Sequence, residues 1–171
     1  MVAALTLNIF NAHSDRVKMA NIAQMVNVLQ AVILTEGEKM ILTPTYHVFD
    51  LYQHHQDADL LETSIETGKT GLLLGEQVPQ LTLSASEDEN GVMHITAANL
   101  SASEPCPVDC GILERKASKV SARILTGPMD AHNTFENPKA VDIQDFTGVS
   151  VTPNGLDFTL PPCSAVEITV E

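Results

Sequence analysis

Basic residues are scarce in this sequence, with nine lysines and arginines among 171 residues against 22 aspartates and glutamates. The formal net charge of −13 excludes the basic surface that nucleic acid or an anionic membrane would require. An acidic surface favours solubility and does not repel a neutral polymer. The charge therefore excludes nucleic-acid and membrane partners and says little more.

Cysteine is also scarce, with only Cys106, Cys110 and Cys163. An odd number of cysteines in a sequence that shows no secretory signal argues against a disulfide framework. Cys106 and Cys110 do not have the C-x₂-C spacing of zinc sites, so we expect ordinary strand or turn cysteines. The first ten residues lack a basic region and a cleavage site. No apolar run reaches the ~18 residues that a membrane-spanning helix needs. We therefore expect a reducing cytoplasm.

Up to about residue 57 the pattern is typical of helices and a buried strand. Ala3–Phe10 has apolar residues at helical spacing. Val17–Leu34 is largely apolar, and a shorter piece of it suits a strand covered on both faces, as in a parallel sheet. Thr43-Pro44 is a good N-cap and first turn for a second helix, which we expect to end within His54–Asp59. Helix, buried strand and helix form the repeat unit of an α/β barrel or a doubly wound sheet.

From Leu60 onward, short alternating segments are separated by turn formers such as Thr152-Pro153-Asn154-Gly155. Many short strands at fairly regular spacing indicate a β-sandwich or jelly roll. The expected strands are Gly71–Leu74, Gln80–Ser86, Val92–Asn99, Val108–Leu113, Lys119–Leu125, Val149–Thr152, Leu156–Thr159 and Ala165–Val170.

The predicted fold class is mixed, with a helix–strand–helix part over residues 1–57 and an all-β sandwich or jelly-roll domain over residues 58–171. A strand that is apolar on both faces cannot bury itself with two helices alone and needs the rest of a sheet. We therefore expect residues 1–57 to belong to a larger body. Within this chain alone, they would have to self-associate or pack against the sandwich.

Three colinear segments carry a resemblance to a known enzyme family. They are Asp15–Val28, Leu42–Tyr52 and His132–Pro138, followed by Leu160-Pro161-Pro162 at the start of a strand. Together they span nearly the whole chain, and the first is the most specific. The sequence resembles the family 51 α-L-arabinofuranosidases.

This resemblance implies an (α/β)₈ TIM barrel that carries the catalysis, followed by a β-sandwich. The chain would supply the last barrel elements over residues 1–57 and the C-terminal sandwich over residues 58–171. The parent enzyme would be an exo-acting, retaining hydrolase that releases terminal arabinofuranose from arabinan, arabinoxylan or oligosaccharides. The resemblance also implies a cytoplasmic homo-oligomer, typically a hexamer, with no metal and no organic cofactor. Because Val2–Phe10 would begin inside a barrel helix, we favour a cut in a longer chain at Met1 over a natural start.

Retaining glycosidases use two carboxylates about 5–5.5 Å apart, an acid/base and a nucleophile. In this family both lie upstream, in Asn-Glu and Asp-Glu-Trp contexts, and neither context occurs here. Glu36 and Glu38 match neither motif. We therefore assign no catalytic residue and expect the 171-residue segment alone to be inactive.

One substrate contact carries over from the resemblance. Gln24 matches a glutamine at the C-terminal end of the last barrel strand, where barrel active sites lie. A neutral amide can donate to and accept from sugar hydroxyls without adding charge beside the carboxylates. Asn27 is a weaker substrate-binding candidate in the following loop. Without the family, the commoner role of Gln24 is a buried amide bonded to protein, and the commoner role of Asn27 is to hold the loop.

The histidines and the rival function complete the sequence-based predictions. His54 and His55 fall at a predicted helix end, where an interaction with the helix dipole or plain solvation is commoner than metal binding. His94 lies in an alternating strand and is expected to face one side of the sheet. The alternative function is a free-standing β-sandwich module that binds glycan or protein. The absence of tryptophan and the apolar strand within Val17–Leu34 argue against it.

Overall fold

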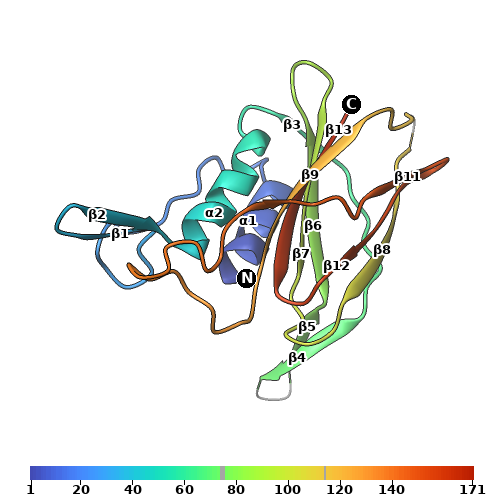
Figure 1. Ribbon diagram of the computed structural model, residues 1–171. Helices are drawn as coiled ribbons and strands as arrows, with labels where there is room; N and C mark the ends of the chain where they lie inside the picture. Colours follow the sequence, from blue (N-terminus) through green and yellow to red (C-terminus); the bar gives the residue numbers. More distant parts are fainter. Residues whose placement is uncertain (74–75, 114) are drawn as a thin grey trace.

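The computed structural model describes residues 1–73, 76–113 and 115–171. Its main body has three layers (Figure 1): two helices, a six-stranded antiparallel sheet and a three-stranded antiparallel sheet. The helices cover one face of the six-stranded sheet, and the three-stranded sheet covers the other face. Two small hairpins, β1–β2 and β4–β5, extend from this body.

The elements follow one another along the chain as short helices and strands. The helices are α1 (Val2–Ala12) and α2 (Pro44–Tyr52), and a 3₁₀ turn, Gln53–His55, continues α2. The strands are β1 (Ile33–Glu36), β2 (Lys39–Leu42), β3 (Asp59–Leu61), β4 (Lys69–Leu73), β5 (Glu76–Pro79), β6 (Leu81–Glu87), β7 (Met93–Asn99), β8 (Cys106–Gly111), β9 (Val120–Thr126), β10 (Gln144–Asp145), β11 (Ser150–Thr152), β12 (Gly155–Leu160) and β13 (Ser164–Val170).

The six-stranded sheet has the order β10-β9-β13-β7-β6-β3, and the smaller sheet has the order β11-β12-β8. All neighbours in both sheets are antiparallel. Ile168 in β13 lies opposite Ile95 on one side and Ala122 on the other, which fixes the register at the centre of the sheet. Each edge strand of this sheet, β10 and β3, is only two or three residues long, and short edges limit pairing with other chains.

Two cores lie on opposite faces of the large sheet. The sandwich core joins residues such as Ile95 and Ile168 to Leu156 and Phe158 of the smaller sheet. The second core joins α1 and α2 to the helix-facing side of the sheet. Its buried members are Ala4, Leu7, Val48, Leu51, Tyr52, Ala98, Leu125, Val141 and Ala165. Residues 1–57 thus pack against the sandwich, one of the two ways expected for burying their apolar surface.

The sequence predicted both helices and the β-sandwich correctly. Helix α1 covers the expected Ala3–Phe10, and α2 begins at Pro44 with Thr43 in the N-cap position. The Thr43 hydroxyl donates to the Ala31 carbonyl at 2.9 Å rather than capping the helix. Each of the expected strands overlaps an observed one, with Leu74 outside the described residues. Strands β1, β2, β3, β5 and β10 were not predicted.

The buried strand expected within Val17–Leu34 was wrong for the chain as folded. Residues 17–32 are irregular, with one isolated bridge between Val26 and Ile33, and β1 begins only at Ile33. Met25 and Leu29 are 57% and 94% exposed. The physical reason is the one that the pattern itself raised: such a strand needs neighbouring strands, and within the described residues it has none.

Asn133, within the segment His132–Pro138 that carries the resemblance, fixes a long loop to the body. The side chain is 5% exposed. Its amide donates to the carbonyls of Leu42 (2.8 Å) and Val141 (2.9 Å) and accepts from the Val141 N–H at 2.7 Å. One buried amide thus connects the end of β2 to the loop after β9.

Gly155 marks a close approach between β12 and β8. Its φ is +151°, and a Cβ there would lie 2.0 Å from the Cys110 carbonyl oxygen. Gly111, its register partner in β8, has ordinary backbone geometry and open space around its Cα. Only glycine therefore fits at position 155, whereas position 111 tolerates a side chain.

We predict that Gly155→Ala lowers the free energy of unfolding by at least about 2 kcal/mol, because the new methyl group meets backbone rather than a movable side chain. The matched variant Gly111→Ala should stay within about 0.5 kcal/mol of the parent. Urea unfolding measures both. Equal stability of the two variants would contradict this account of the β8–β12 contact.

We also predict that Asn133→Asp destabilises the fold by about 3 kcal/mol, because a carboxylate cannot donate to the two carbonyls and its charge would be buried. Asn137→Asp, at an exposed position in the same loop, is the control and should have little effect. Thermal unfolding distinguishes the two. Similar melting temperatures for both variants would show that Asn133 does not hold this loop.

Candidate functional site

The two predicted substrate-binding residues lie in the irregular segment 17–32. Gln24 is exposed and has a left-handed backbone, with φ of 54°. Asn27 is also left-handed, at φ 53°. Its amide donates to the Thr35 hydroxyl at 2.8 Å and accepts from the Thr35 N–H at 2.7 Å. Asn27 therefore holds the loop to β1, whereas the Gln24 amide makes no hydrogen bond within the described part of the chain.

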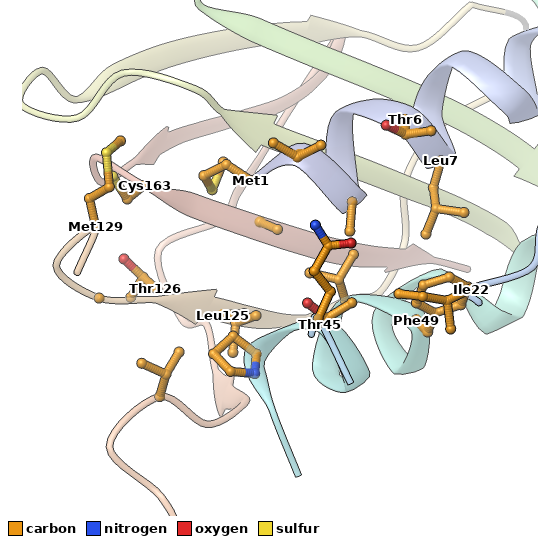
Figure 2. Close-up of a pocket in the computed structure, with 18 of the residues that line it drawn as sticks. Met1, Thr6, Leu7, Ile22, Thr45, Phe49, Leu125, Thr126, Met129 and Cys163 are labelled. Atoms are coloured by element: carbon orange, nitrogen blue, oxygen red, sulfur yellow. The ribbon is translucent and has the colours of Figure 1, made fainter. Parts of the chain in front are cut away.

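A cavity of about 630 Å³ lies between α1, the N-terminal end of α2 and β9 (Figure 2). Its walls are mainly apolar, with Leu7, Phe49 and Leu125 among them. No Asp, Glu or His is among its described lining residues, and neither Gln24 nor Asn27 lines it. The cavity therefore lacks the pair of carboxylates that glycoside hydrolysis needs.

Polar chemistry instead gathers where the helices meet the sheet. The buried Asn8 side chain of α1 accepts from the hydroxyls of Ser84 (2.8 Å) and Thr96 (3.0 Å). His55, just after α2, lies 2.8 Å from the Thr96 hydroxyl through Nε2 and 2.7 Å from the Ser86 hydroxyl through Nδ1. This network links both helices to β6 and β7, and it gives partners to the buried hydroxyls and to Oδ1 of Asn8, although Nδ2 of Asn8 has none among the described residues.

The network favours neutral His55. Because the Thr96 hydroxyl donates to Asn8, it accepts from Nε2–H of His55, and Nδ1 then accepts from Ser86. Burial, together with repulsion from the neighbouring His94 and His54, lowers the pKa of His55 to about 4. His55 is thus a structural hydrogen-bonding group at neutral pH.

A second polar cluster lies beside this network. The rings of His54 and His94 stack with centroids 4.9 Å apart, and both face the buried carboxylate of Glu167. His94 faces the helix side of the sheet. His54 contacts the carboxylate of Glu167, whereas solvation or an interaction with the helix dipole was expected. Glu167 could not be predicted as their partner, because the three residues come from the 3₁₀ turn after α2, from β7 and from β13, and they share no motif.

We predict that the free energy of unfolding falls as the pH is lowered from ~7 to ~4. In the unfolded chain His55 is protonated at its ordinary pKa of 6.5, whereas in the folded chain its pKa is about 4. The contribution of His55 is complete above the unfolded pKa and is lost as pH falls, by up to roughly 3 kcal/mol. Urea unfolding across this range should show a flatter pH dependence for His55→Gln than for the exposed control His13→Gln. Equal slopes in both variants would contradict the role given to His55.

Comparisons with known proteins place the whole chain in one family. The family model described as "Alpha-L-arabinofuranosidase C-terminal domain" matches residues 1–164. An intracellular exo-alpha-L-arabinofuranosidase of Bacteroides ovatus is 38% identical over 171 residues, which are 99% of this chain and 33% of that protein.

Solved structures agree with the sequence comparison. The crystal structure of the GH51 arabinofuranosidase from Xanthomonas axonopodis pv. citri is 42% identical, with a TM-score of 0.94 over 99% of this chain and 34% of the other. The thermostable GH51 α-L-arabinofuranosidase from Thermotoga petrophila is 31% identical, with a TM-score of 0.85 over 99% of this chain and 37% of the other.

The chain thus spans about a third of the length of the relatives that it matches. Neither helix in the described ranges has the length and apolar character that crossing a bilayer requires. The family match covers both the helices and the sandwich, so it identifies the entire three-layer body rather than a shared sheet alone. The chain belongs to the α-L-arabinofuranosidase C-terminal domain family, as a C-terminal segment of a family 51 glycoside hydrolase.

Proposed function

We propose that this chain is the non-catalytic C-terminal part of an exo-acting, retaining α-L-arabinofuranosidase. The main support for this proposal is the length of the match. Relatives with this activity in their names align with 99% of this chain, but the alignment covers only about a third of each relative. The chain also lacks the Asn-Glu and Asp-Glu-Trp contexts that the family resemblance implies for the two catalytic carboxylates. The segment alone is therefore inactive, and the substrate of the whole protein is an arabinofuranosyl-containing oligosaccharide or polysaccharide.

Within the whole protein, residues 1–57 would be the last elements of the catalytic (α/β)₈ barrel, and residues 58–171 the C-terminal β-sandwich domain. The exposed apolar side chains of residues 17–32 support this division. Met19, Met25 and Leu29 are 74%, 57% and 94% exposed, which is costly for a segment with no partner. Neighbouring barrel strands would cover them and draw the segment into an extended strand.

In that arrangement Gln24 would reach the sugar from the C-terminal end of the last barrel strand. Its amide is free of hydrogen bonds to the described residues, and it carries no charge that would disturb the carboxylates. Asn27 is proposed as a second, weaker substrate contact. Its two hydrogen bonds with Thr35 would set the position of the loop.

The remaining proposals concern the setting of the enzyme. The sandwich would have a structural role and would join subunits. The assembly would be a cytoplasmic homo-oligomer, a hexamer as the family resemblance implies. The net charge of −13 supports the absence of nucleic-acid and membrane partners. Catalysis by two carboxylates requires no metal and no organic cofactor.

The activity is tested with the full-length protein that carries this sequence and an aryl α-L-arabinofuranoside. We expect release of the aryl group with retention of configuration, and no release by the 171-residue chain. Inactivity of the full-length protein would contradict the proposal. Measurable arabinan affinity of the 171-residue chain by itself would favour the free-standing binding module instead.

The substrate contact is tested by Gln24→Ala in the full-length protein. We predict a fall in kcat/KM of roughly 10- to 100-fold, the effect of losing one or two hydrogen bonds to the sugar. Gln30→Ala is the matched control, because Gln30 lies in the same segment with a similar left-handed φ of 65°. Equal kinetics for the two variants would remove Gln24 from the binding site.

A further inference from the structure

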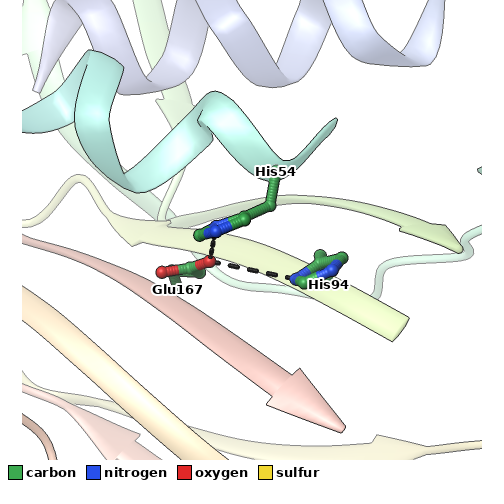
Figure 3. Close-up of side chains that lie close together, drawn as sticks. All are labelled: His54, His94 and Glu167. Carbon is green, nitrogen blue, oxygen red and sulfur yellow. Dashed lines mark ion pairs between the residues drawn. The ribbon is translucent and has the colours of Figure 1, made fainter. Parts of the chain in front are cut away.

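The cluster of His54, His94 and Glu167 brings three metal-ligand atoms together (Figure 3). Nδ1 of His54 contacts Oε1 of Glu167, and Nδ1 of His94 lies 3.9 Å from the same oxygen. All three donor atoms lie within 4.8 Å of one another. The two imidazoles and the carboxylate thus converge on one point between the end of α2, β7 and β13.

Two of these donors are buried and lack a suitable partner. The side chains of Glu167 and His94 are 3% and 7% exposed. Among the described residues, neither Oε1 of Glu167 nor Nδ1 of His94 makes a hydrogen bond of normal geometry, although His54 lies against that oxygen. Unpaired buried polar atoms are costly, so this arrangement calls for a ligand that both atoms can bind.

The outer side of Glu167 is already hydrogen-bonded, and a carboxylate lies near the outer side of His94. Oε2 of Glu167 accepts from Arg123 through Nε at 2.9 Å and Nη2 at 2.6 Å. Nε2 of His94 lies 3.6 Å from the Asp88 carboxylate. Carboxylates behind a ligating histidine, and hydrogen bonds behind a ligating carboxylate, are the usual support of metal sites. They leave Oε1 and Nδ1 directed toward the shared point.

The charge around the cluster also favours a cation. Asp50 lies 3.5 Å from Arg123, Glu167 lies 2.6 Å from it, and Asp88 lies 3.6 Å from His94, so three carboxylates and one guanidinium surround the cluster. With neutral histidines the formal charge is −2. A divalent cation would neutralise it, whereas protonating one histidine would not.

We propose that His54, His94 and Glu167 bind a divalent transition-metal ion, with Zn²⁺ as the preferred ion. Two imidazole nitrogens and one carboxylate oxygen form a recurrent zinc ligand set, in which water takes the fourth position. Zinc–ligand bonds of about 2.0–2.1 Å in a tetrahedron separate the donors by roughly 3.3 Å. His54, with 44% of its side chain exposed, has room to turn to that separation and leaves a side open for water.

A simple ion pair explains the cluster less well. Arg123 already neutralises Glu167, and a pair between His54 and Glu167 leaves Nδ1 of His94 without a partner. His55 does not compete for the ion, because hydroxyl groups occupy both of its ring nitrogens. The ion would join the end of α2 to the two central strands and so fasten the helix layer to the sheet. This departs from the expectation, drawn from the family resemblance, that the protein holds no metal, and it does not depend on the proposed activity.

The test is calorimetric titration of Zn²⁺ into the full chain after removal of metals with a chelator. We expect one equivalent to bind and to raise the melting temperature, and Co²⁺ to give the visible absorption of a tetrahedral site. His54→Gln should weaken Zn²⁺ binding at least tenfold and abolish the thermal shift. His132→Gln, which alters an exposed histidine in another loop, should bind Zn²⁺ like the parent chain.

Glu167→Gln provides a second test, since it keeps the size of the side chain and an acceptor for Arg123 and loses the charge that binds the ion. Circular dichroism establishes whether each variant is folded. If Glu167→Gln does not fold, Zn²⁺ binding by His54→Gln, which alters a half-exposed side chain, tests the proposal. The proposal is overturned if the parent chain shows no saturable Zn²⁺ binding. It is equally overturned if His54→Gln binds Zn²⁺ as tightly as His132→Gln does.

Discussion

The two central strands of the large sheet, β7 and β13, are buried on both faces, and the rest of the structure depends on this double burial. Ile95 and Ile168 face the smaller sheet, whereas Ala98 and Ala165 face the helices. Alanines on the helix side let α1 and α2 approach the sheet closely, and the larger aliphatic side chains fill the wider space of the sandwich. Without the helix layer one whole face of the sheet would lie in water, which explains why residues on both sides of position 57 share a core.

The same face also carries polar side chains, and their position follows from the alternation of the strands. His94 and Thr96 share the face of Ala98, and Glu167 shares the face of Ala165. Once the helices cover this face, each polar group needs a partner. Asn8 and His55 supply partners for the hydroxyls. Three buried polar atoms of this interface lack a hydrogen-bond partner among the described residues: Nδ2 of Asn8, Nδ1 of His94 and Oε1 of Glu167. The last two lie together in the cluster of His54, His94 and Glu167, and the proposed metal site follows from that.

The sequence predicted the elements that depend on local pattern. Helix α2 could be placed from Thr43-Pro44, and the sandwich strands could be placed from alternation and turn formers. Residues 17–32 could not be, because an apolar segment shows only that it needs a partner, and the described chain contains no strand to pair with it. The candidate sites divide in the same way. Gln24 came from a family motif, whereas the cluster around Glu167 arises from the register of β7 and β13, which no single stretch of sequence encodes.

The central claim is that these residues form the C-terminal part of a larger family 51 glycosidase subunit. Relatives that match 99% of the chain are about three times as long. The most direct test is the intact mass of the subunit that carries this sequence, purified from its native source and measured under denaturing conditions. The account predicts a mass about three times the 18.4 kDa of this chain. A subunit of 18.4 kDa would contradict it, because the apolar segment 17–32 would then have no barrel to complete.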